Sequence, residues 1–222
     1  MIAFLGWVAC TDAVGTGAAA FEAGDLPGAI RAWEAAPAPR SGVIEYDLGI
    51  AWYRSGDLAR AIARFRAAAR LRPRDGNVQH NLALARAGLA PGIPEPVGSP
   101  GWTAVLTPGE LGLLAVLTTA LGSLMVFPRR SRTLGGLALA GGLGAGGFAT
   151  VAAFDLRAHP VVVVVDQEIV LRDAASVNAG ERLRLPVGAE VRVAATHDVF
   201  LLVEDSRGRR GWVPTNGVEA AW

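Results

Sequence analysis

The amino-acid sequence predicts a multidomain α + β protein with N-terminal helical repeats, a transmembrane hairpin of two helices and a small C-terminal β-barrel. The first part of the chain, 13–89, shows an amphipathic helical period and an internal repeat. The middle part, 109–155, contains two long uncharged stretches. The last part, 159–222, changes to short valine-rich segments with a period of two.

The clearest helical repeat begins near Gly42 and ends at Pro73, which would stop the second of two packed helices. Small residues would let the two helix backbones approach, and large aromatic residues would fill the space between them. This segment resembles the tetratricopeptide repeat of roughly 34 residues. With a less regular unit before it and a helix at 77–87, the resemblance implies two repeats and a capping helix. The residues that carry it are Leu48, Gly49, Trp52, Gly56, Ala61, Phe65, Ala68 and Pro73.

Stacked helix pairs form a concave face, and the resemblance implies that this face receives an extended peptide or a partner helix. Tyr46, Ile50 and Tyr53 could equally be packing residues. No second histidine or cysteine lies at metal-ligand spacing from His80, so we expect no metal site there. The expected partner-binding residues are Phe21, Tyr46, Asp47, Ile50, Tyr53, Arg54, His80 and Asn81.

A linker rich in proline and glycine, 90–108, separates the repeats from the two uncharged stretches. These stretches, 111–127 and 133–154, contain about 17 and about 22 residues, close to the roughly 20 that cross a hydrocarbon core. The alternative is a buried helical hairpin in a soluble protein. Helices that are apolar on every face would then need a large domain around them, which the flanks are too small to supply. The sequence therefore favours a transmembrane hairpin.

The short connector 128–132 contains three arginines, and this excess of positive charge predicts a cytoplasmic loop. Both larger flanks would then face outward, so in a Gram-negative host we expect two periplasmic domains anchored in the inner membrane. The first residues, 1–12, fit a truncated signal peptide, an ordinary first helix or a lipidated Cys10. Cys10 is the only cysteine, so no internal disulfide is expected.

The C-terminal part contains short strands at 161–165, 168–172, 182–185, 190–194, 200–204 and 211–213. A polar turn, a Gly211-Trp212-Val213 strand and a short helical turn before the last strand resemble a bacterial SH3-like domain. The resemblance implies a β-barrel that binds peptides or cell-wall components in a groove between its loops. Trp212 could instead pack in the barrel core. The expected groove residues are Asp173, His197, Asp198 and Trp212.

The order of repeats, linker, hairpin and SH3-like domain resembles the BatE-type proteins of bacterial aerotolerance (Bat) operons. The resemblance implies a non-catalytic scaffold whose partners are membrane-anchored von Willebrand factor A-type Bat proteins, often accompanied by a MoxR-type ATPase. An alternative is a membrane module that binds peptidoglycan or senses the wall. We expect the lipid bilayer itself to be a further partner.

The sequence contains no paired nucleophile and base and no phosphate-binding motif, so we expect neither an enzyme nor a cofactor. The formal net charge is +1 at pH 7, and a concentrated basic surface that would neutralise nucleic-acid phosphates is missing from the sequence. We therefore expect no nucleic-acid partner.

Overall fold

The structure is a computed structural model that describes residues 13–89, 93, 108–126, 140, 143–144, 147, 160–166 and 168–221. The predicted signal segment 1–12, the arginine connector 128–132 and most of the linker 90–108 lie outside the described residues. The chain forms two compact units. One contains Met1–Val97 and Pro160–Trp222, and the other contains Gly98–His159.

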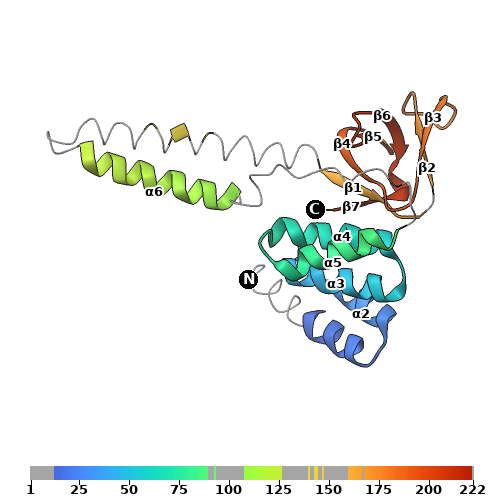
Figure 1. Ribbon diagram of the computed structural model, residues 1–222, viewed down its shortest axis with the longest axis horizontal. Helices are drawn as coiled ribbons and strands as arrows, with labels where there is room; N and C mark the ends of the chain where they lie inside the picture. The colour runs from blue at the N-terminus through green and yellow to red at the C-terminus, as the bar shows by residue number, and fades with distance from the viewer. Residues whose placement is uncertain are drawn as a thin grey trace. The chain divides into compact units, whose positions relative to one another are not determined.

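The first unit begins with helices that pack as neighbours in chain order. Residues 13–22 are helical. They precede four helices with the bounds α2 Leu26–Glu34, α3 Gly42–Ser55, α4 Leu58–Leu71 and α5 Gly76–Ala87. Helix α3 packs on both α2 and α4, and α5 packs on α4. Successive helices therefore form one layer of the unit (Figure 1).

Each of these four helices begins after a residue whose side chain accepts a hydrogen bond from a backbone N–H of the first turn. In α4, for example, Asp57 Oδ1 accepts from the N–H of Arg60 at 2.9 Å. Helix α3 ends at Gly56, whose φ of 88° is a left-handed conformation that glycine adopts without a steric cost. Local sequence therefore fixes the helix ends. The capping residues are Asp25, Ser41, Asp57 and Asp75.

Helices α3 and α4 approach closely because glycine faces an aromatic ring. A Cβ atom added at Gly49 would lie 2.5 Å from Cδ1 of Phe65, so any other residue would collide with the ring. Phe65 is only 1% exposed, which leaves it little room to move away.

The C-terminal strands form one antiparallel sheet in the order β3-β2-β6-β5-β4-β1-β7. One face of this sheet carries its own apolar core, to which Leu171, Val191, Val203 and Val213 contribute. The short helical turn η3, Thr215–Gly217, leads into the last strand. The strand bounds are β1 Val161–Val164, β2 Ile169–Arg172, β3 Glu181–Leu185, β4 Glu190–His197, β5 Phe200–Glu204, β6 Arg210–Pro214 and β7 Val218–Ala220.

A second apolar core joins the helices to the sheet. Phe65 of α4 and Leu82 of α5 belong to the same buried cluster as Val163 of β1 and as Val165 and Ala221, which directly follow β1 and β7. Figure 1 shows β1 and β7 beside α4, and both strands contact that helix. The helices and the sheet are thus packed as two layers of one unit.

This arrangement corrects the predicted fold class of tetratricopeptide repeats, a two-span hairpin and a closed SH3-like β-barrel. Strands β3 and β7 are the two edges of the sheet, so the sheet is open and the barrel prediction is wrong. The helices share a core with the sheet, which does not fit a separate tetratricopeptide array. Periodicity locates helices and strands, but it does not say that β7 pairs with β1 and packs on α4.

The second unit contains helix α6, Pro108–Val126, which overlaps the first predicted span. Within the described part of the chain, no helix is long and apolar enough to cross a membrane. Only the part of α6 after Glu110 is uncharged, and it is about 24 Å long against a hydrocarbon core of about 30 Å. The predictions of a transmembrane hairpin and of an inner-membrane protein with periplasmic domains are therefore contradicted. Most of the second predicted span, 133–154, lies outside the described residues.

Candidate functional site

One side of helix α3 is only partly covered by the rest of the unit, and we call this side the α3 face. At 100° per residue its members form a stripe about 120° wide. The opposite side of α3 is buried and includes Ile44, Leu48 and Ala51. The α3 face consists of Val43, Tyr46, Asp47, Ile50, Tyr53 and Arg54.

Neighbouring residues hold the tyrosine at one end of the α3 face in place. The ring of Tyr46 packs at a tilt against Phe65, with a centroid distance of 5.9 Å. Asn81 Nδ2 donates a hydrogen bond to the Tyr46 hydroxyl at 2.8 Å. The guanidinium of Arg72 lies 5.9 Å from the centroid of the same ring. Tyr46 therefore presents a fixed, half-buried aromatic surface.

At the other end of the α3 face, Arg54 is held over an aromatic ring. The guanidinium carbon of Arg54 lies 4.5 Å from the centroid of Phe21, which is a cation–π geometry. Phe21 in turn packs against Trp33, with the ring centroids 5.8 Å apart. Arg54 is exposed and forms no ion pair with any residue that the structure describes. The Phe21 ring therefore holds the Arg54 guanidinium in place, but no described carboxylate neutralises its charge.

Asp47 is a half-buried carboxylate without a hydrogen bond or ion pair to a described residue. Burial raises the pKa of Asp47 above its ordinary value, and the positive charge of Arg72 opposes that effect. Arg72 forms an ion pair with Asp75, so its guanidinium is already engaged. The folded chain therefore exposes a carboxylate that would gain from a cationic partner.

Replacing Asp47 with asparagine is expected to stabilise the fold at pH 7. A carboxylic acid whose pKa is raised on folding favours the protonated form, so above that pKa its negative charge opposes folding. Asparagine removes the charge at nearly the same size. Urea denaturation of both chains measures the effect, and a clear loss of stability in the variant would contradict it. Glu22→Gln, at an exposed position of the first helix, is the control and should leave stability unchanged.

The structure places seven of the eight predicted partner-binding residues around α3. Five lie on α3 itself, and Phe21 and Asn81 contact that helix through Arg54 and Tyr46. His80 is exposed on α5 and makes no ion pair within the described residues. The alternative that these are packing residues holds in part, because Tyr46 and Ile50 also contact the core shared with the sheet.

Sequence reasoning missed Val43, which is 49% exposed on the same face. The signal was present, since Val43 precedes Asp47 by four residues and Ile50 by seven, the spacing of one helical face. Val43 is the second residue of α3, and the side of a helix to which its first residues belong is hard to assign from sequence.

A second surface lies on the sheet, on the face opposite to its core. Trp212 pairs in register with Leu202 of β5 and Arg172 of β2, so these three residues share a face. Trp212 is half-buried and lies outside the core cluster, in contrast to the alternative that it packs inside. His197 packs edge-on against it, with ring centroids 6.2 Å apart. The structure thus brings His197 and Trp212 together.

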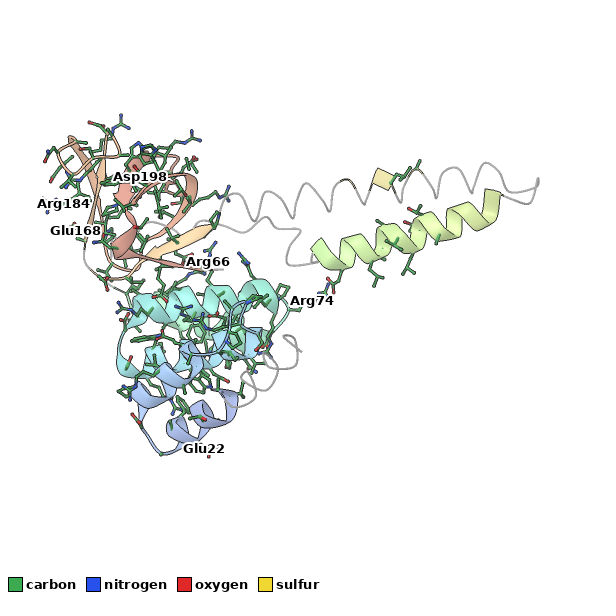
Figure 2. All side chains as sticks on the ribbon, turned by 180° about the vertical axis from the view of Figure 1, so that it is seen from behind. Glu22, Arg66, Arg74, Glu168, Arg184 and Asp198 are labelled. Atoms are coloured by element: carbon green, nitrogen blue, oxygen red, sulfur yellow. The ribbon has the colours of Figure 1, made fainter. Side chains whose placement is uncertain are left out.

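The remaining two predicted groove residues are exposed. Asp198 occupies the β4–β5 turn with a φ of 49°, and its carboxylate lies 3.7 Å from Nε2 of His197. Asp198 lies in the sheet part of the unit, as Figure 2 shows. Asp173 follows β2 and forms an ion pair with Arg182. Asp173 is therefore already engaged within the sheet.

The β5–β6 turn is held by a buried carboxylate, Asp205. It accepts hydrogen bonds from the backbone N–H groups of Arg207 and Arg209, each at 2.9 Å, and from the Arg209 guanidinium. Burial alone would raise the pKa of Asp205, but these hydrogen bonds and the charge of Arg209 outweigh it and lower the pKa. The ionised form is therefore favoured in the folded chain.

This lowered pKa predicts an acid-sensitive contribution to stability. The contribution of Asp205 is present above the ordinary aspartate pKa of about 3.9 and is lost as the pH falls through the lower pKa of the folded chain. Asp205→Asn should lower stability at pH 7 and flatten its decrease below about pH 4, as urea denaturation at several pH values would show. Asp198→Asn is the matched control and should keep the decrease of the wild-type chain.

Buried charges join the helices to the sheet. Glu190, at the start of β4, is 3% exposed and forms ion pairs with Arg66 of α4 and Arg86 of α5. The Nε and Nη2 atoms of Arg86 donate to its two carboxylate oxygens at 2.7 and 2.9 Å. Figure 2 shows Arg66 where the helices meet the sheet. Burial, and then the positive charges of Arg86, Arg192 and Arg70, lower the pKa of Arg66 to about 10.

Arg66 thus remains protonated at neutral pH, and the Glu190 carboxylate offsets part of the positive charge at this interface. These ion pairs therefore help to hold the helices and the sheet in one relative position.

Among the described residues, no group of three or more histidine, cysteine, aspartate or glutamate side chains could hold a metal ion.

Comparison with known proteins gives no relative for this chain. No protein-family model, curated protein or solved structure matches it.

Proposed function

We propose that this protein is a non-catalytic scaffold that binds another protein through the α3 face. The observation that carries the proposal is a surface whose interactions the chain itself leaves incomplete. It combines the half-exposed side chains of Val43 and Tyr53 with a carboxylate and a guanidinium that form no ion pair to described residues. Aromatic side chains and arginine are enriched where proteins bind one another.

The packing of the helices on the sheet supports a scaffold in particular. The α3 face and the surface around Trp212 belong to one compact unit, and a shared core and the ion pairs of Glu190 hold its two layers together. Two surfaces fixed in one unit can hold two partners at a constant separation. Von Willebrand factor A-type proteins, which the Bat resemblance suggested, are the first partners to test. The domain order on which that resemblance depends differs from the arrangement described above. The partner is therefore defined mainly by the chemistry of the α3 face, and the family resemblance only suggests which proteins to test.

Photo-crosslinking in the host cell tests this proposal. A photoreactive phenylalanine analogue placed at Tyr53, which is 40% exposed, should form an adduct with one defined protein. Placed at Val177, which is 72% exposed in the β2–β3 loop, it should not form that adduct. Val43→Arg should weaken the adduct at position 53, because it puts a bulky charge at the N-terminal end of the face, on the same side of α3 as Ile50. Equal adducts at both positions, or none at Tyr53, would refute a partner site on the α3 face.

A second candidate function is binding of peptidoglycan, and the half-buried Trp212 with His197 beside it favours this function. An aromatic ring on an open sheet face could stack on a sugar ring. Purified murein sacculi should then retain the full chain in a sedimentation assay, and Trp212→Ala should abolish retention. Equal retention of the variant, or no retention of the wild-type chain, would exclude this function.

A further inference from the structure

The two charged residues of the α3 face lie along one edge of it. Asp47 and Arg54 are seven residues apart, which places them on the same side of the helix and about 10 Å apart along its axis. Tyr46 and Tyr53 form the opposite edge, and Ile50 lies between the two edges. The face therefore has a charged edge, an aromatic edge and an apolar centre.

The negative end of the charged edge favours a cation. The carboxylate of Asp47 has lost part of its hydration, because burial raises its pKa, and it has no ion pair to a described residue in return. The guanidinium whose charge acts on it, that of Arg72, is bound to Asp75. An incoming ammonium or guanidinium group would restore the lost interaction as a charge-assisted hydrogen bond.

The positive end of the charged edge favours a carboxylate. The ring of Phe21 covers one face of the Arg54 guanidinium, at 4.5 Å. The N–H groups in the guanidinium plane form no hydrogen bond to a described residue, so they can still donate. A planar guanidinium held in this way matches the two oxygens of a carboxylate.

We infer that the α3 face recognises a polypeptide segment with one cationic and one anionic side chain about 10 Å apart and an apolar side chain between them. The cation binds Asp47, the carboxylate binds Arg54, and the apolar side chain packs on Ile50. Such a separation corresponds to about three residues of an extended chain or about seven of a helix. This inference rests on the proposed function and adds the chemistry of the partner.

Selection from a random library of displayed 12-residue peptides tests the inference. The immobilised targets are the full chain and the variants Asp47→Asn, Arg54→Gln and Tyr53→Ala. A matched control, Glu168→Gln with Arg184→Gln, removes an exposed ion pair of the sheet, where Figure 2 shows both residues. Each enriched sequence is then synthesised, and its affinity for every chain is measured by calorimetry.

The wild-type chain and the control should enrich peptides with a basic and an acidic residue three or seven positions apart. Asp47→Asn should lose only the preference for the basic residue, and Arg54→Gln only that for the acidic residue, each with an affinity loss of about tenfold. Peptides that depend on Tyr53 but show no such charge pair would overturn the inference and leave the proposed function standing. If no enriched peptide depends on Tyr53, both are overturned.

Discussion

Replacing Glu190 with alanine is expected to lower the free energy of unfolding by about 3–5 kcal/mol. Glu190 is 3% exposed, and its carboxylate binds Arg66 from α4 and Arg86 from α5. Without it two guanidinium groups remain at a buried interface with no carboxylate between them, next to the further positive charges of Arg70 and Arg192. Urea denaturation followed by tryptophan fluorescence measures the loss.

Glu204→Ala is the matched control for this experiment. Glu204 also lies on the sheet and forms an ion pair with an arginine, Arg210, but the side chain of that arginine is 62% exposed. An exposed pair contributes at most about 1 kcal/mol, so the control should change stability little. Equal losses in the two variants would show that Glu190 does not hold the interface together.

Replacing Phe65 with alanine is also expected to cost about 3–5 kcal/mol of folding free energy. Its ring is 1% exposed, fills the space against Gly49 and belongs to the core that the helices share with the sheet. Alanine would leave a cavity in the centre of the unit. Because both layers contribute to this core, the far-ultraviolet circular dichroism and the tryptophan fluorescence should shift together to lower urea.

Leu71→Ala, at an exposed position of the same helix, is the control and should cost less than about 1 kcal/mol. A different result for the two probes would be equally informative. If the helices unfolded at lower urea while the sheet kept its midpoint, the two layers would not share a core in solution.

The sequence predicted the individual helices and strands of the first unit well. Helix ends follow from local chemistry, as Asp57 and Gly56 show, and the valine-rich strands lie within a few residues of their predicted places. The assembly of these elements was predicted wrongly. The resemblance to separate tetratricopeptide and SH3-like domains assumed that each part covers its own apolar surface, whereas α4 and β1 cover each other.

The candidate site shows the same division between local and distant information. The α3 face could be read from helical spacing, because Tyr46, Ile50 and Tyr53 recur on one side of a single helix. Which charged residues of this face lack an ion-pair partner among the described residues could not be predicted from helical spacing. The burial of Asp47 and the approach of Arg72 to α3 depend on how α4 packs on that helix, although the ion pair of Arg72 with Asp75 joins residues only three apart in the sequence.

The sequence by itself determined where helices and strands begin and end, because caps, glycine turns and periodicity act over only a few residues. Only the tertiary structure decided that the sheet stays open and shares its core with the helices. It also decided that Glu190 meets Arg66, 124 positions away along the chain. The reason is physical: several pairings satisfy the same apolar pattern, and only complementary shape and buried charge in three dimensions select among them.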